Sequence, residues 1–155
     1  MTTTGSAPSP RRLWTGRPLW QVGLAAAVVA AAASVAVYAA GRAAGVPMAL
    51  TEVFEDKFAR MPVANMVFAA LLEGGLAGTV LAAACRRWAP RPRVWFLALA
   101  AVGLVASFAL PITSDGSTAT KVVLSISHVV VAAIIVPALA LALPVSADRP
   151  GKRGQ

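Results

Sequence analysis

The sequence predicts an all-α protein: a bundle of four transmembrane helices with a short amphipathic helix in one outer loop. Of its 155 residues, 58% are apolar and 13% are charged, whereas soluble chains are about 45–50% apolar and about 25% charged. The mean hydropathy is +0.73. The apolar residues form long runs, and the basic and tryptophan residues gather at one set of their ends. We therefore expect lipid to surround most of the chain.

Four apolar runs are long enough to cross a bilayer, which takes roughly 20 residues. They cover residues 19–40, 63–85, 94–112 and 122–143. Together they predict one membrane domain over 18–143, with disordered cytoplasmic tails at 1–17 and 144–155. The first run is longer than the 7–15 apolar residues typical of a signal peptide, so we interpret it as an uncleaved span.

The distribution of basic residues predicts the orientation. Ten of the 14 lysines and arginines fall on the side of both termini and the middle loop: Arg11, Arg12, Arg17, Arg86, Arg87, Arg91, Arg93, Arg149, Lys152 and Arg153. The positive-inside rule places that side in the cytoplasm. All four tryptophans lie beside the same ends, where indole rings favour the interface. The net charge of +8 is thus a topology signal, and nucleic acid is not an expected partner.

The connection between the first two spans carries a helical pattern. Its apolar residues recur at spacings of four, four and three: Leu50, Phe54, Phe58 and Met61. Charged residues fill most of the remaining positions, which is typical of an amphipathic helix. This helix would lie either in the membrane interface or across the outer mouth of the bundle.

Small residues predict where the helices approach closely, because lipid gives helices no hydrophobic reason to pair. In the second span, Gly74 and Gly78 lie within a stripe of small residues spaced by four. In the third span, Gly103 and Ser107 form a similar pair. We predict that these four residues lie at helix–helix contacts.

Ionisable residues inside the spans are the candidate functional groups. Glu73 is roughly 15 Å from the outer start of its span, and His128, the single histidine, is roughly 9 Å deep. Lys121, Ser125 and His128 follow i, i+4, i+7 spacing and should share one face of the fourth span. Since polar groups in a membrane normally face the bundle interior, we hypothesise that Glu73 pairs with His128, directly or through water.

Purely structural alternatives exist for each of these groups. Glu73 could be a neutral acid bonded to a carbonyl or hydroxyl, and His128 a neutral residue of the bundle. Lys121 could extend to the outer interface. The sequence contains no recognisable nucleophile–base–acid set, metal cluster or phosphate-binding loop. We therefore expect no enzyme activity, no cofactor and no metal.

One segment carries a resemblance. The stretch LPITSDGSTATKVVLSISHVVVAAIIVPAL, residues 110–139, follows a longer outer loop and a Pro-Arg-rich turn, and places Lys121 seven residues before His128. In this plan, over residues 13–143, the chain resembles a family of small uncharacterised four-span bacterial membrane proteins. The resemblance implies the same topology, draws attention to Lys121 and His128, and implies no activity. The alanine-, arginine-, glycine- and proline-rich composition fits a GC-rich genome, and we expect the chain in a bacterial inner membrane.

The leading functional expectation is a non-enzymatic structural or accessory membrane subunit. Its partners would be the lipid bilayer and either a second copy or another membrane protein. The alternative is a proton- or small-solute-handling protein that uses Glu73 and His128. A quinone- or lipid-binding membrane enzyme is a third class, which would require a copurifying cofactor.

Overall fold

Four long helices form an elongated bundle in the computed structural model, which describes residues 17–51 and 58–146. Each is long and apolar enough to cross a membrane: Leu19–Ala43, Val63–Trp88, Pro92–Thr113 and Thr118–Ala142. The all-α, four-span fold predicted from the sequence is confirmed, with the helices extending a few residues beyond several predicted span ends. The predicted disordered tails lie almost wholly outside the described residues.

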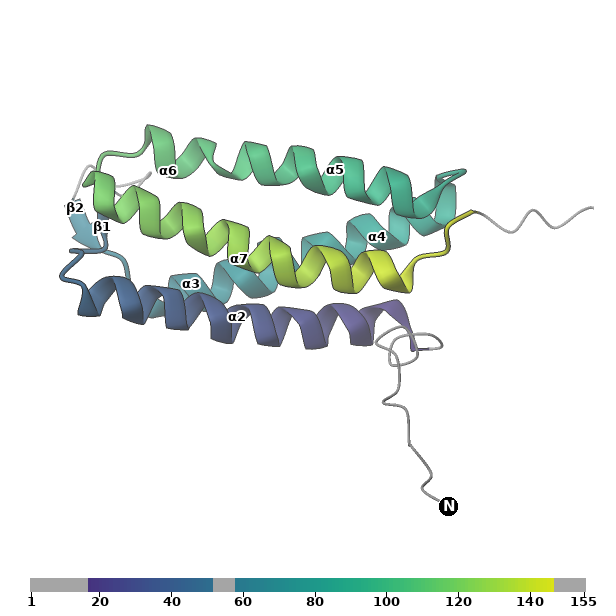
Figure 1. Cartoon of the computed structure of the whole chain (residues 1–155), viewed down its shortest axis with the longest axis horizontal. Helices are drawn as coiled ribbons and strands as arrows, with labels where there is room; N and C mark the ends of the chain where they lie inside the picture. The colour runs from purple at the N-terminus through teal and green to yellow at the C-terminus, as the bar shows by residue number, and fades with distance from the viewer. Residues whose placement is uncertain (1–16, 52–57, 147–155) are drawn as a thin grey trace, which may run out of the picture.

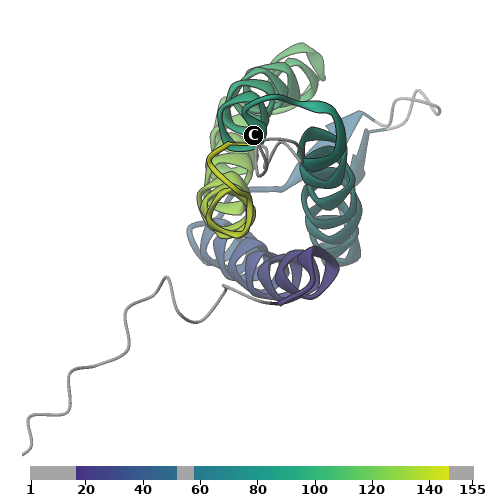
Figure 2. The same ribbon diagram turned by 90° about the vertical axis from the view of Figure 1, so that its right-hand side faces the viewer.

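The helices are arranged as a ring (Figure 2). Helix α2 (Leu19–Ala43) packs along α7 (Thr118–Ala142), although they are the first and last spans in the sequence. The second span comprises α3 (Val63–Ala69), η1 (Ala70–Leu76) and α4 (Ala77–Trp88), and it also packs against α2. The third span, α5 (Pro92–Ser107) followed by α6 (Ala109–Thr113), contacts α4 and α7.

Both described chain ends lie at the same end of the bundle as the turn between α4 and α5 (Figure 1). The opposite end carries the turn between α6 and α7 and the long connection after α2. The structure thus separates the two groups of connections that the basic residues distinguish in the sequence.

The long connection contains two strands where the sequence predicts an amphipathic helix. Strand β1 (Ala49–Thr51) pairs antiparallel with β2 (Phe58–Arg60). The helix prediction is therefore wrong for these residues, and its centre, residues 52–57, lies outside the described part of the chain. Tyr38 of α2 donates a hydrogen bond of 2.9 Å to the carbonyl of Met61, which fastens the end of the strand pair to the bundle.

A helix stop ends α2 before this connection. Gly45 adopts a left-handed conformation with φ of 81°, and its N–H donates to the Arg42 carbonyl. The next N–H, of Val46, donates to the Gly41 carbonyl. These two bonds form the Schellman motif that ends helices. After Pro47, Met48 adopts a left-handed conformation with φ of 49°, and β1 begins at the next residue.

The second span contains a π-helical segment, η1, that the sequence analysis did not predict. Its two consecutive glycines meet two different neighbours. A Cβ on Gly75 would collide with the Ala27 side chain of α2, and one on Gly74 would lie 2.7 Å from Ile135 Cδ1 of α7. Glycine at position 75 is therefore required for the approach to Ala27, whereas a side chain at position 74 would require the Ile135 and Val131 side chains to move.

The third span is interrupted between α5 and α6. Pro111 has no N–H to donate to the carbonyl of Ser107, four residues earlier. The Phe108 N–H instead bonds the Val105 carbonyl at 3.2 Å, a tighter turn. The interruption leaves α6 as a short separate helix beside the outer end of α7.

Replacing Gly75 by Ala should destabilise the bundle by about 1–3 kcal/mol, because overpacking a tight contact forces the backbone to shift. Gly103→Ala is the matched control, since a Cβ there would have nothing within 4 Å. The free energy of unfolding in mixed detergent–SDS micelles measures both. Equal stability of the two variants would contradict the contact between η1 and α2.

Candidate functional site

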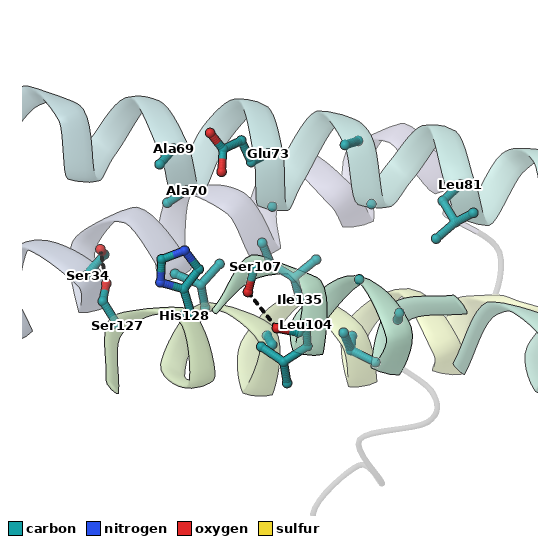
Figure 3. A pocket seen from close by; sticks show the side chains of 18 of the residues that line it. Ser34, Ala69, Ala70, Glu73, Leu81, Leu104, Ser107, Ser127, His128 and Ile135 are labelled. Atoms are coloured by element: carbon teal, nitrogen blue, oxygen red, sulfur yellow. Dashed lines mark hydrogen bonds between the residues drawn. The ribbon is translucent and has the colours of Figure 1, made fainter. Parts of the chain in front are cut away.

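A cavity of about 400 Å³ lies inside the ring of helices. Its walls come from α3, η1 and α4 on one side and α5 on the other, and its floor comes from α7 with Ser34 of α2. The volume falls in the range of about 300–1,000 Å³ found for small-molecule sites. The lining is mostly apolar, with a few polar side chains: Ser34, Glu73, Ser107, Ser127 and His128 (Figure 3).

The cavity opens between the second and third spans. Helix α5 packs against α4 and α7 but not closely against α3 or η1. Glu73 and Ala77 on one wall and Leu99 and Gly103 on the other are exposed, whereas the floor residues are buried or half-buried. Glu73 and Gly103 lie near the middle of spans of 26 and 22 residues. The opening therefore faces the hydrocarbon region of a bilayer.

Glu73 lies at the centre of the π-helical segment. Within the described residues it makes no hydrogen bond and no ion pair. An acidic side chain at the centre of a membrane helix costs about 2.5–3.5 kcal/mol on insertion scales. A short π-helix is itself frequently found at functional sites. An unpaired carboxylate on such a segment, beside a cavity, is the strongest candidate functional group of the molecule.

His128 projects from α7 toward the second span and lines the same cavity (Figure 3). Its Nδ1 lies 2.8 Å from the carbonyl oxygen of Leu124. Because a carbonyl oxygen only accepts, Nδ1 carries the hydrogen in this bond, and the Nε2 of the neutral ring is left as an acceptor. The Phe108 ring packs at a centroid distance of 6.3 Å and helps to hold the imidazole in place.

The structure brings Glu73 and His128 to one cavity, as the sequence analysis expected, but does not bond them directly. The histidine uses the Leu124 carbonyl, one turn away on its own helix. The directly bonded form of the hypothesis therefore does not describe this structure. A water bridge between the two side chains remains a prediction.

Lys121 and Ser125 do not join this site. They line a separate groove between α6 and α7, next to Phe108 and Ile112. The Lys121 Nζ donates a hydrogen bond of 3.1 Å to the Ile112 carbonyl, near the end of α6, where helix carbonyls attract cations. This bond holds Lys121 away from the face that it shares with His128 by spacing.

The four predicted packing residues fall into two groups. Gly74 and Gly78 of the second span lie against Ile135 of α7, with Gly78 at ordinary van der Waals distance. A Cβ added to Gly103 would meet no other atom within 4 Å. Gly103 instead lines the cavity, as does Ser107. The hydroxyl of Ser107 donates to the Leu104 carbonyl at 2.7 Å on its own helix. The third-span pair thus borders an open space.

One polar contact was missed from the sequence. The hydroxyls of Ser34 and Ser127 lie 2.7 Å apart, and both residues are almost completely buried. This hydrogen bond joins α2 to α7 at the floor of the cavity. An isolated serine in an alanine-rich span was the available signal, since such side chains often bond across helices.

Metal ligands do not cluster in residues 17–51 and 58–146, where no group of three or more His, Cys, Asp or Glu side chains could hold an ion. Glu73 and His128 are also the two titratable side chains among the cavity-lining residues. The polar chemistry of the cavity therefore depends on this pair and on the serine hydroxyls.

Four apolar spans around a laterally open cavity define a small multi-pass membrane protein. A family model described as "Family of unknown function (DUF6069)" matches residues 8–144. The chain belongs to this family. No curated protein and no solved structure matches the chain.

Glu73→Gln should leave the free energy of unfolding within about 0.5 kcal/mol of the parent, because Glu73 has no partner whose loss would destabilise the bundle. Ser127→Ala is the comparison: it leaves the buried Ser34 hydroxyl unpaired and should cost about 1 kcal/mol. SDS titration in micelles measures both. A larger loss from Glu73→Gln would show that Glu73 is structural.

Proposed function

We propose that this chain is a non-enzymatic accessory protein of the membrane, which holds a lipid-soluble molecule in its cavity rather than transforming it. The observation that carries the proposal is the cavity of about 400 Å³ with its opening between α5 and η1 at the depth of the hydrocarbon. A molecule dissolved in the bilayer could enter it without crossing water.

The shape of the cavity supports binding from the side. Its floor is closed by the contact between α2 and α7, which includes the Ser34–Ser127 hydrogen bond. Its walls are largely apolar, as lipid-soluble ligands require, and its few polar groups can orient a ligand. Gly103 adds no side-chain atoms to the α5 wall, and a Cβ there would meet nothing within 4 Å.

The exposed face of α5 supports an accessory role. Buried residues make up 12% of the most apolar stretch of the third span, against 39% for α2. This face is available to lipid, to a second copy or to another membrane protein. A partner that binds there would border the mouth of the cavity.

Proton or small-solute handling is a second candidate, favoured by one observation: Glu73 is unpaired and shares the cavity with His128. A carboxylic acid and an imidazole on opposite sides of one cavity are groups that proton relays use. This role would require a hydrated path to Glu73 from both membrane surfaces, and a pH-dependent flux in liposomes that Glu73→Gln abolishes.

We further propose that the protein lies in a bacterial inner membrane with both termini in the cytoplasm, as the excess of basic residues at that end favours. Alkaline phosphatase, which folds only after export, should be active when fused after Gly116, between α6 and α7. It should be inactive when fused after Pro90 or Gln155. An active fusion at Gln155 would reverse this orientation.

Filling the cavity should abolish ligand retention. Gly103→Phe adds a ring where a Cβ meets nothing within 4 Å, and should lower the occupancy of copurifying small molecules about tenfold, which is about 1.4 kcal/mol. Val102→Phe is the matched control, because Val102 is 66% exposed on the same helix and does not line the cavity. Native mass spectrometry in detergent measures occupancy. Equal retention by both variants, or none in the parent, would contradict the proposal.

A further inference from the structure

We propose that the cavity binds a lipid-soluble primary amine in its protonated form, with the ammonium group paired to the Glu73 carboxylate. This inference rests on the proposed function and adds to it the chemical class of the ligand. It follows from which hydrogen-bonding groups of the cavity already have partners, from the charge of its lining, and from the depth of its opening.

The cavity offers acceptors in preference to donors. The Nδ1–H of His128 is used by the Leu124 carbonyl, and the hydroxyl of Ser107 donates to Leu104. Ser34 and Ser127 bond each other at the buried floor, which leaves at most one hydroxyl proton there. The atoms that remain for a ligand are the Glu73 carboxylate, Nε2 of His128 and the lone pairs of Ser107, all of which accept.

The charge of the lining selects a cation. No lysine or arginine is among the residues that line the cavity, and Lys121 is held by the Ile112 carbonyl in the separate groove. Among the described residues, no lysine or arginine therefore places a positive charge beside Glu73, and a His128 ring that donates only from Nδ1 to Leu124 is uncharged. A bound cation would supply the opposite charge that the Glu73 carboxylate lacks.

An ammonium group matches this set of acceptors better than other cations. It has three N–H donors on one compact centre, and three acceptor groups remain on three different elements: η1, α5 and α7. A quaternary ammonium has the charge but no donors, and a neutral alcohol has a donor but no charge. Comparing a primary ammonium, a quaternary ammonium and a neutral alcohol therefore separates the contribution of charge from that of hydrogen bonding.

The depth of Glu73 argues for a free amine rather than the headgroup of a phospholipid. Glu73 lies ten residues into its span, roughly 15 Å along the helix from Val63. Phospholipid headgroups lie at the surface of a hydrocarbon core about 30 Å thick. An amine on a slender apolar group can reach the middle of the span through the lateral opening, whereas a headgroup would have to leave the interface.

The test uses three fluorescent probes with one ring system: 1-pyrenemethylammonium, its trimethylammonium analogue and neutral 1-pyrenemethanol. The full chain is placed in phosphatidylcholine nanodiscs, and binding is measured by energy transfer from the tryptophans. The ammonium probe should bind about tenfold tighter than the alcohol, which is about 1.4 kcal/mol. Glu73→Gln should remove this difference and leave alcohol binding unchanged. Lys121→Gln also removes one charge but lies outside the cavity, so it should change neither the affinity difference nor the binding of the alcohol.

The outcomes separate the two proposals. If the alcohol binds and Gly103→Phe blocks it, but the ammonium probe gains nothing from Glu73, the amine inference fails and the proposed function stands. If no probe binds, both fail. Equal binding of the trimethylammonium and ammonium probes would overturn the inference that the N–H donors of the ammonium group contribute to binding. If phosphatidylethanolamine in the nanodiscs displaces the ammonium probe, the ligand is a lipid headgroup, and the inference of a free amine is wrong.

Discussion

The structure depends on the close approach of one backbone segment to two helices at once. In lipid, apolar side chains gain little by leaving their surroundings, so helices associate through van der Waals packing and a few hydrogen bonds. Here Gly75 lets η1 approach Ala27 of α2, and Gly74 lets it approach Ile135 of α7. This three-way contact fixes the second span against the first and the fourth. The third span, which packs mainly against α4 and α7, is left further away, and the cavity is the space between.

The contact also determines where the carboxylate lies. Glu73 directly precedes the two glycines, so the packing that holds η1 between its neighbours places Glu73 at the edge of the cavity. The Ser34–Ser127 hydrogen bond closes the floor from the opposite side. One tightly packed half and one loosely packed half thus coexist in a single bundle. The polar groups lie along the boundary between them.

The sequence predicted the spans well because each depends on a local property, the length of an apolar run. The strand pair was not predictable in this way, since the spacing of Leu50, Phe54 and Phe58 matches a helix locally. Pairing of Ala49 with Arg60 is a contact between distant positions that no local period reveals. The helix stop at Gly45 was visible in the sequence, because glycine readily adopts the left-handed conformation that ends helices, but it marks only the end of α2.

The candidate site was predictable in its residues more than in its contacts. Glu73 and His128 were found because ionisable groups are rare in lipid and normally face inward. Lys121 was placed on the same face by spacing, but its Nζ bonds the Ile112 carbonyl near the end of α6 instead. Ser34 and Ser127 were missed because their bond depends on how far α2 and α7 are shifted along each other.

The π-helical segment has a consequence for how insertions and deletions are tolerated. Each residue added to or removed from an α-helix turns everything that follows by about 100° around the axis. The wide turns of η1 accommodate their extra length locally, so the faces of α3 and α4 keep their separate alignments with α2 and α5. A homologue one residue shorter between Ala70 and Leu76 could form a regular α-helix there and keep both alignments. In this stretch, a difference of one residue in length is therefore tolerated more readily than in the α-helical parts of the span.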